Sequence, residues 1–310
     1  MRRPSAAVIL ILSVFMAVPA IAGQFEDATK AYQRGDYKTA YSLLKPLAEQ
    51  GSPKSQYNLG LMYSLGHGVP RDYVEAVKWY RKAADQGHLP SQYNLGFMYA
   101  NGQGVPRDYV EAVKWYRKAA DQGSASAQYN LGRMYALGQG VPLDKVEAVK
   151  WYRKAADQGD ASAQFNLGLM YSNGQGVPQD YAGAVKWYRK AADQGDAPAR
   201  YNLGLMYALG QGVPQDNAAA ANWYRKAADQ GDASAQFNLG LMYGTGQGVP
   251  QDLVLSHMWF TLAASRVPAS ERGRREMAEK NRDLAASKMT PAQVAEAQRL
   301  AREWKPKLGR

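Results

Sequence analysis

The sequence predicts an all-α solenoid in which six copies of a helix-turn-helix unit follow one another along the chain. The first observation is a glycine after Asn-Leu that recurs every 36 residues, at Gly60, Gly96, Gly132, Gly168, Gly204 and Gly240. A tryptophan keeps the same step, at Trp79, Trp115, Trp151, Trp187, Trp223 and Trp259. A fixed period of about 20–50 residues is typical of repeat proteins, in which each unit buries its apolar face only against its neighbours. We therefore expect one domain, because the core of such an array grows with its length.

The first helix of the unit is visible in the first copy, Ser52–Gly87. Leu59, Met62 and Tyr63 are three and four residues apart, which is the spacing of one helix face. The helix should end before Gly66, because glycine adopts the left-handed C-terminal cap without strain.

The second helix begins after a Val-Pro step, since a residue that precedes proline avoids the helical region. Asp72 is a suitable N-cap, and Glu75 three residues later predicts a capping box. The same pair recurs as Asp108/Glu111 and Asp144/Glu147. Gly87 marks the end of the second helix, so two helices and two glycine stops make one hairpin.

The repeat pattern A-x-x-x-L-G-x-M-Y-x-x-G-x-G-V-P-x-D-x-x-x-A-x-x-W-Y-x-x-A-A-x-x-G resembles the Sel-one-like repeat, a relative of the tetratricopeptide repeat. The resemblance covers residues 52–267 in six copies. It implies a right-handed α/α superhelix in which the first helix of each pair lines the concave side. It also implies a protein-binding adaptor, and many members of this family are bacterial and exported.

Residues 1–22 are typical of a signal peptide. Arg2 and Arg3 precede an apolar run at 6–18, and Ala20-Ile21-Ala22 predicts cleavage before Gly23. The alternative is an uncleaved anchor, which the short apolar run disfavours. The chain has no cysteine, which excludes disulfides and a cysteine-linked lipid anchor. We expect an exported protein, periplasmic or secreted, with no membrane span in the mature chain.

Both ends of the repeat array carry sequences that depart from the repeat. Residues 23–51 predict a shortened, tetratricopeptide-like capping unit that lacks the G-x-G-V-P loop. Residues 268–310 predict C-terminal capping helices, the last of which opens with Thr290 as N-cap, Pro291 and Gln293. Terminal units of this kind cover the core that an array exposes at its ends.

Comparison of the six copies separates positions that serve the fold from positions open to solvent or a ligand. In the first helix, Leu59 and Met62 barely change between copies, so we expect them on the packing face. The opposite arc varies, for example from Leu61 to Phe97 and Arg133. Aromatic and arginine side chains are frequent energetic anchors in interfaces. The variation therefore predicts a binding groove along this arc.

The predicted groove combines these variable side chains with an aromatic residue and an asparagine that recur in every copy. Its residues are Tyr57, Asn58, Leu61, Tyr93, Asn94, Phe97, Asn101, Tyr129, Asn130, Arg133, Leu137, Phe165, Asn166, Leu169, Tyr201, Asn202 and Leu205. One alternative is that the rings pack between adjacent repeats. Another is that the asparagines satisfy neighbouring helix ends instead of a peptide backbone.

A basic ridge on the second helices gives an alternative binding surface for an anionic envelope polymer or lipid. Lys78, Arg81 and Lys82 recur in several copies. Glu75 and Asp85 lie in the same arc and offset much of this charge, so an ordinary solvated face is the competing interpretation. The export signal disfavours nucleic acid as a partner.

No catalytic constellation stands out. The three histidines belong to no repeated pattern, and no cysteine or H-x-x-x-H pair predicts a metal site or cofactor. Ser42 and Lys45 match S-x-x-K, but the accompanying motifs of β-lactam or cell-wall hydrolases are absent. We therefore predict a non-enzymatic protein-binding scaffold of the bacterial cell envelope or exterior, whose partner is another protein, for example through an extended peptide segment.

Overall fold

The computed structural model describes residues 23–307, with the side chain of Ala269 left aside. The signal peptide predicted at 1–22 lies outside the described residues. The chain divides into two compact units, Met1–Asp144 and Lys145–Arg310, and each is considered by itself.

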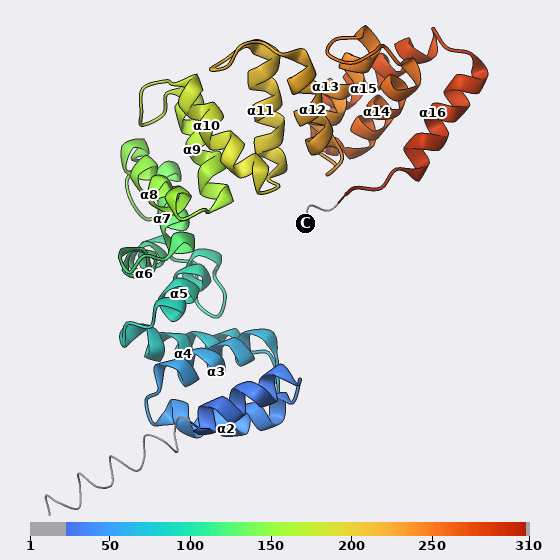
Figure 1. Ribbon diagram of the computed structural model, residues 1–310. Coiled ribbons are helices and arrows are strands. Elements are labelled where there is room, and N and C mark those ends of the chain that lie inside the picture. Colours follow the sequence, from blue (N-terminus) through green and yellow to red (C-terminus); the bar gives the residue numbers. More distant parts are fainter. Residues whose placement is uncertain (1–22, 308–310) are drawn as a thin grey trace, which may run out of the picture. The chain divides into compact units, whose positions relative to one another are not determined.

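The described residues form helices and no strands, as the repeat pattern predicts (Figure 1). The first unit contains a helix over residues 23–33, then α2 (Tyr37–Glu49), α3 (Pro53–Leu65), α4 (Tyr73–Asp85), α5 (Leu89–Asn101), α6 (Tyr109–Asp121) and α7 (Ala125–Leu137). The second contains α8 (Lys145–Asp157), α9 (Ala161–Asn173), α10 (Tyr181–Asp193), α11 (Ala197–Leu209), α12 (Asn217–Ala228), α13 (Ala233–Thr245), α14 (Leu253–Arg266), the 3-10 helix η1 (Ala269–Glu271), α15 (Arg272–Ala286) and α16 (Pro291–Glu303). Helices α3 to α14 are the helix pairs of the six repeats, which confirms the all-α repeat fold.

The predicted helix boundaries are confirmed in the first repeat. Gly66 is the C-cap of α3, with a left-handed φ of 75°, and its N–H donates to the Met62 carbonyl. Asp72 is the N-cap of α4, and its carboxylate accepts the N–H groups of Val74 and Glu75 at 2.9 and 3.1 Å. Local cap chemistry therefore fixes both ends of the turn between the two helices.

The predicted capping box at Asp72/Glu75 does not form, and neither does the box at Asp108/Glu111. The backbone N–H of Asp72, which the glutamate should accept, donates instead to the carbonyl of Tyr63 at 2.9 Å. Glu75 is thereby released to accept from Lys78 at 2.6 Å. The box predicted at Thr290/Gln293 does form, at the start of α16.

The core runs through the repeats on one face of each first helix. Leu59 and Met62 are fully buried, as predicted. Trp115, from the second helix of repeat two, packs with Leu95 of its own repeat and Tyr80 of the preceding one. Trp115 therefore belongs to the contact between the first two repeats as well as to its own hairpin.

The N-terminal helices cover the open end of the first repeat. Ala28 and Leu44 share one apolar cluster with Leu59 of α3. His67, in the loop after α3, stacks on the Tyr37 ring with 4.2 Å between ring centroids.

The C-terminal helices α15 and α16 both pack on α14, where a seventh repeat would otherwise begin (Figure 1). Trp304, directly after α16, meets the Trp259 ring edge-on with centroids 6.4 Å apart. The Arg266 guanidinium lies 4.3 Å from the centre of the Trp304 ring. Lys307 then pairs with Asp229 at 2.8 Å, so the tail returns to the end of α12.

Candidate functional site

The variable side chains of the predicted groove lie on the open face of the first helices. Phe97 of α5 is 43% exposed and Leu137 of α7 is 55% exposed, which is unusual for large apolar side chains. Arg133 is also exposed, whereas Leu169 and Leu205 are half-buried. Leu61 is half-buried, and Asn101 is exposed.

The recurrent aromatic residues form the floor between the two helices of a repeat. In five repeats the half-buried ring meets a buried aromatic ring of its own second helix, which is Phe260 for Phe237, at 5.4 Å, and a tyrosine in the other four. The ring centroids are 5.8 Å apart for Tyr57–Tyr80, 5.9 Å for Tyr93–Tyr116, 6.0 Å for Phe165–Tyr188 and 5.7 Å for Tyr201–Tyr224. Tyr129 is half-buried at the corresponding position. The rings therefore contribute mainly to packing, within each repeat and not only between repeats.

The recurrent asparagines are half-buried beside this floor and hydrogen-bond in two ways. In three first helices the side-chain amide donates to the carbonyl four residues earlier: Asn130 to Ser126, Asn166 to Ser162 and Asn202 to Pro198, at 2.8–2.9 Å. No described residue donates to the Oδ1 atoms of these three asparagines. Each side-chain carbonyl is therefore available to a ligand.

Asn94 contacts the preceding repeat instead, since its side chain hydrogen-bonds to the hydroxyl of Tyr80. Burial raises the pKa of Tyr80 to about 12, although hydrogen bonds from Ser64 and Asn94 partly offset this effect. The phenol is therefore neutral and can donate at physiological pH. Asn58 is half-buried at the same position of the first repeat.

The groove continues into the sixth repeat, which the predicted residue set does not include. Phe237 and Asn238 of α13 line a hollow of about 160 Å³ together with Tyr201 and Arg274. Leu241 lines a second hollow of about 260 Å³, again with Asn238. Phe237, Asn238 and Leu241 lie 36 residues after Tyr201, Asn202 and Leu205, so the repeat period alone could have predicted them.

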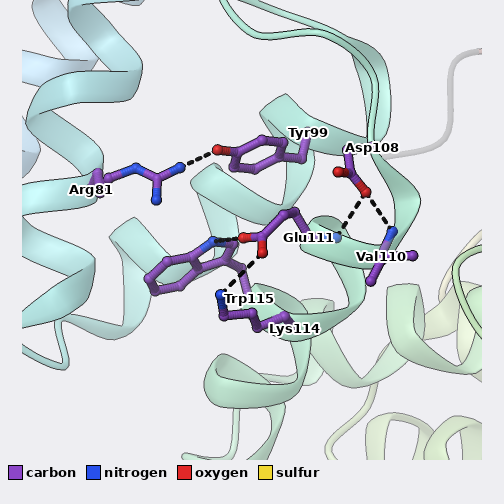
Figure 2. A network of polar contacts seen from close by, with 7 residues as sticks. All are labelled: Arg81, Tyr99, Asp108, Val110, Glu111, Lys114 and Trp115. Atoms are coloured by element: carbon purple, nitrogen blue, oxygen red, sulfur yellow. Dashed lines mark hydrogen bonds and ion pairs between the residues drawn. The ribbon is translucent and has the colours of Figure 1, made fainter.

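The arginines of the basic ridge make contacts between neighbouring repeats. Arg81 of α4 donates to the hydroxyl of Tyr99 in the next first helix, and its guanidinium lies 5.9 Å from the Trp115 ring centre (Figure 2). The same link is made by Arg117–Tyr135, Arg153–Tyr171, Arg189–Tyr207 and Arg225–Tyr243. The sequence indicated the arginines but not this role, because their tyrosine partners lie 18 residues away.

The second lysine of the ridge also has an intramolecular partner. Lys82 Nζ lies 4.0 Å from the centre of the Trp79 ring, within the range of a cation–π contact. Equivalent pairs are Lys118–Trp115, Lys154–Trp151, Lys190–Trp187 and Lys226–Trp223, at 3.9–4.2 Å. The ridge therefore offers fewer uncommitted cations than its sequence indicates, and it does not favour the anionic-polymer alternative.

We expect Arg189→Met to lower the free energy of unfolding by about 1 kcal/mol, because the link to Tyr207 is partly exposed to solvent. Chemical denaturation of Arg189→Met, Tyr207→Phe and the double variant measures the coupling between the two side chains. Arg302→Met is the control, since Arg302 is exposed and has no hydrogen bond, ion pair or cation–π contact among the described residues. Strictly additive losses in the double variant would show that the link contributes nothing.

The S-x-x-K pair is not arranged as a nucleophile and its base. The Ser42 hydroxyl donates to the Thr39 carbonyl at 2.8 Å, and the Lys45 ammonium lies over the Tyr41 ring. This geometry gives no support to a serine hydrolase at α2. Within residues 23–307, no helix has the length and apolar character needed to cross a membrane.

Comparisons with known proteins agree with this architecture. The profile of the Sel1 repeat matches residues 53–88, 89–124, 125–160, 161–196, 197–232 and 233–266. A protective antigen of uropathogenic Escherichia coli with an SLR fold superposes with a TM-score of 0.74 and 43% identity, covering 85% of this chain and 56% of that one. A Sel1 repeat protein from Oxalobacter formigenes gives 0.68 and 36%, covering 77% of this chain and 96% of the other.

A curated relative is similar only over a short stretch. DAP3-binding cell death enhancer 1 of Rattus norvegicus is 41% identical over 71 residues, which are 23% of this chain and 14% of that protein. The chain thus spans about one seventh of the length of that relative and just over half of the E. coli antigen chain.

Proposed function

Because the chain belongs to the Sel1 repeat family, we propose that it is a non-enzymatic scaffold that binds a protein partner along the open face of its first helices. The coarser conclusion, that this is a repeat scaffold of the kind used for protein–protein interaction, follows from the family and the fold. The finer proposal rests on one observation. The side chains that differ between otherwise near-identical repeats, Phe97, Arg133 and Leu137, are exposed together on that face.

An extended segment of the partner suits this surface. Within the second unit, the Oδ1 atoms of Asn166 and Asn202 stand 36 residues apart in sequence, and each can accept a backbone N–H group. Asn130 offers the same acceptor in the first unit. Phe97 and Arg133 belong to residue types that often dominate binding energy. Recurrent asparagines would thus hold the backbone, and the variable positions would select the side chains.

A crosslinking pull-down tests the proposal. We expect a photoreactive amino acid at Phe97 or Leu137 of the full chain to capture one protein, identified by mass spectrometry, and Phe97→Ala with Arg133→Ala to lower the captured amount at least tenfold. Val110, which is 64% exposed on the second helix α6, gives the matched control positions for both the crosslinker and the alanine change. Equal capture from Val110 and from Phe97 would contradict a partner on the first helices.

We further propose that this scaffold acts in the bacterial cell envelope or outside the cell. The support is the positive start, apolar run and A-x-A site within residues 1–22. Cell fractionation with N-terminal sequencing is expected to find a mature protein that begins at Gly23 in the periplasm or the medium. Recovery of the uncleaved chain in the cytoplasm would refute this location.

A further inference from the structure

A carboxylate stands at the start of the second helix in each of the first three repeats. Glu75, Glu111 and Glu147 each accept from the lysine three residues later, at 2.6, 3.0 and 2.9 Å. The second oxygen of Glu111 also accepts the indole N–H of Trp115 at 3.2 Å (Figure 2). In α6, one carboxylate therefore joins an ammonium group and a buried indole.

The fourth repeat keeps both donors but has no such carboxylate. Gly183 of α10 occupies the glutamate position, whereas Lys186 and Trp187 remain. Trp187 is only 8% exposed, and no described residue accepts its indole N–H. Lys186 makes no ion pair within the described part of the chain. The ring of Trp187 is buried, but its indole nitrogen is not among the buried unpaired atoms of the described residues, so the N–H faces solvent. Both donors of the fourth repeat are therefore accessible to an external acceptor.

An open hollow of about 570 Å³ lies beside Gly183. A Cβ atom at Gly183 would lie 2.6 Å from Asp180 Oδ2, so the Asp180 carboxylate borders this position. The lining of the hollow includes Gly183, Lys186 and Trp187 of α10, with Arg153 from α8 and Tyr171 from α9. Asp157 and Asp180 also line it. The equivalent set in the second repeat is Arg81, Lys114, Asp85 and Asp108, and that set already accommodates Glu111 as a third carboxylate. The surroundings in the fourth repeat therefore lack one negative charge relative to the second repeat.

The last two repeats differ from the fourth in an informative way. Where the glutamate is replaced by Ala219 and Leu255, the lysine three residues later is replaced as well, by Asn222 and Met258. Only the fourth repeat retains the cation without its anion.

We infer that the hollow at the start of α10 binds the carboxylate of an acidic side chain from a protein partner. That carboxylate takes the position of the Glu111 carboxylate in α6, accepting from Lys186 Nζ and from the Trp187 indole N–H. A glutamate or aspartate side chain is the fitting occupant, because the Glu111 carboxylate makes both contacts in α6. The inference rests on the proposed scaffold function and adds a second contact, on a different helix face from the groove.

Nuclear magnetic resonance of the indole N–H groups tests the site directly. The chain has seven tryptophans, so ¹⁵N-indole labelling of the mature protein gives few signals, and Trp187→Phe identifies the relevant one. The probe is acetyl-Gly-Glu-Gly-amide, and acetyl-Gly-Gln-Gly-amide is its neutral control. We expect a saturable downfield shift of the Trp187 signal with the glutamate peptide only.

Matched variants separate the site from general effects on folding. Gly183→Glu supplies the missing carboxylate from the chain itself, so the Trp187 signal should move without the probe and lose its response to it. Gly183→Gln adds a side chain of the same size without the charge, so the Trp187 signal should stay at its parent position in the absence of the peptide. Lys186→Met should weaken the response about tenfold, as expected for loss of one charge-assisted hydrogen bond. Unmoved signals of the other tryptophans confirm that each variant is folded.

The reverse change provides a gain of function. Glu111→Gly is expected to make the Trp115 signal sensitive to the glutamate peptide, because it recreates the arrangement of the fourth repeat. A Trp187 signal that ignores the peptide up to high millimolar concentration, or that responds equally to the glutamine peptide, would overturn the inference. Neither result depends on the natural partner, so the groove proposal is judged separately by the crosslinking experiment.

Discussion

Gly104→Ala is expected to lower the free energy of unfolding by more than about 3 kcal/mol, the largest effect of any single methyl group considered for this chain. Gly104 has a φ of +70°, and a Cβ atom there would lie 2.2 Å from the Tyr73 carbonyl oxygen and 2.8 Å from the Val74 nitrogen. Both obstacles are backbone atoms at the start of α4, so they cannot rotate away. The substitution should therefore separate the loop of the second repeat from the first.

Gly123→Ala is the matched control, because Gly123 also has a positive φ, +96°, but nothing lies within 4 Å of its Cβ position. Strain alone should then cost about 1–2 kcal/mol. Urea denaturation of both variants, followed by circular dichroism, measures the difference. Equal losses would mean that the close approach of Gly104 to α4 contributes nothing.

Gly96→Ala is expected to destabilise the protein by about 1–3 kcal/mol, although alanine favours a helix over glycine by about 1 kcal/mol. The reason is packing, since a Cβ atom at Gly96 would lie 2.8 Å from Cδ1 of the buried Tyr116 ring. Close approach of α5 to α6 requires that the ring pass directly over the glycine.

The same substitution at Gly273 is expected to have the opposite sign. Gly273 lies in α15, and nothing is within 4 Å of its Cβ position, so Gly273→Ala should stabilise by up to about 1 kcal/mol. Thermal denaturation of the two variants beside the parent protein gives both signs in one experiment. A stabilising Gly96→Ala would contradict the proposed role of the ring contact.

Sequence features that span only a few residues predicted the helix ends well. The stop at Gly66 and the cap at Asp72 depend on backbone geometry that neighbouring residues dictate, and both are confirmed. The capping box failed because the Asp72 N–H is used by the Tyr63 carbonyl, nine residues earlier, which a four-residue motif cannot reveal.

Contacts between repeats were the part that sequence could not supply. The period shows that Arg81 and Tyr99 recur together, but not that they touch, because this requires the stacking geometry of two hairpins. For the groove, variation between copies identified Phe97 as an open position, and the structure places it there. That Phe97 binds a partner stays a prediction, since exposure alone names no ligand.

The first five repeats have a glutamine near the end of the second helix, and the sixth has Arg266 at that position. Arg266 stacks on Trp304, which has a practical consequence. In the first repeat the corresponding residue, Gln86, donates to the Gly51 carbonyl of the capping unit and to Gln56 of its own repeat. Arg266 instead turns toward the terminal segment, so the last hairpin is not interchangeable with the others. We therefore expect a longer protein to keep the last hairpin in place, with any new module inserted ahead of α13.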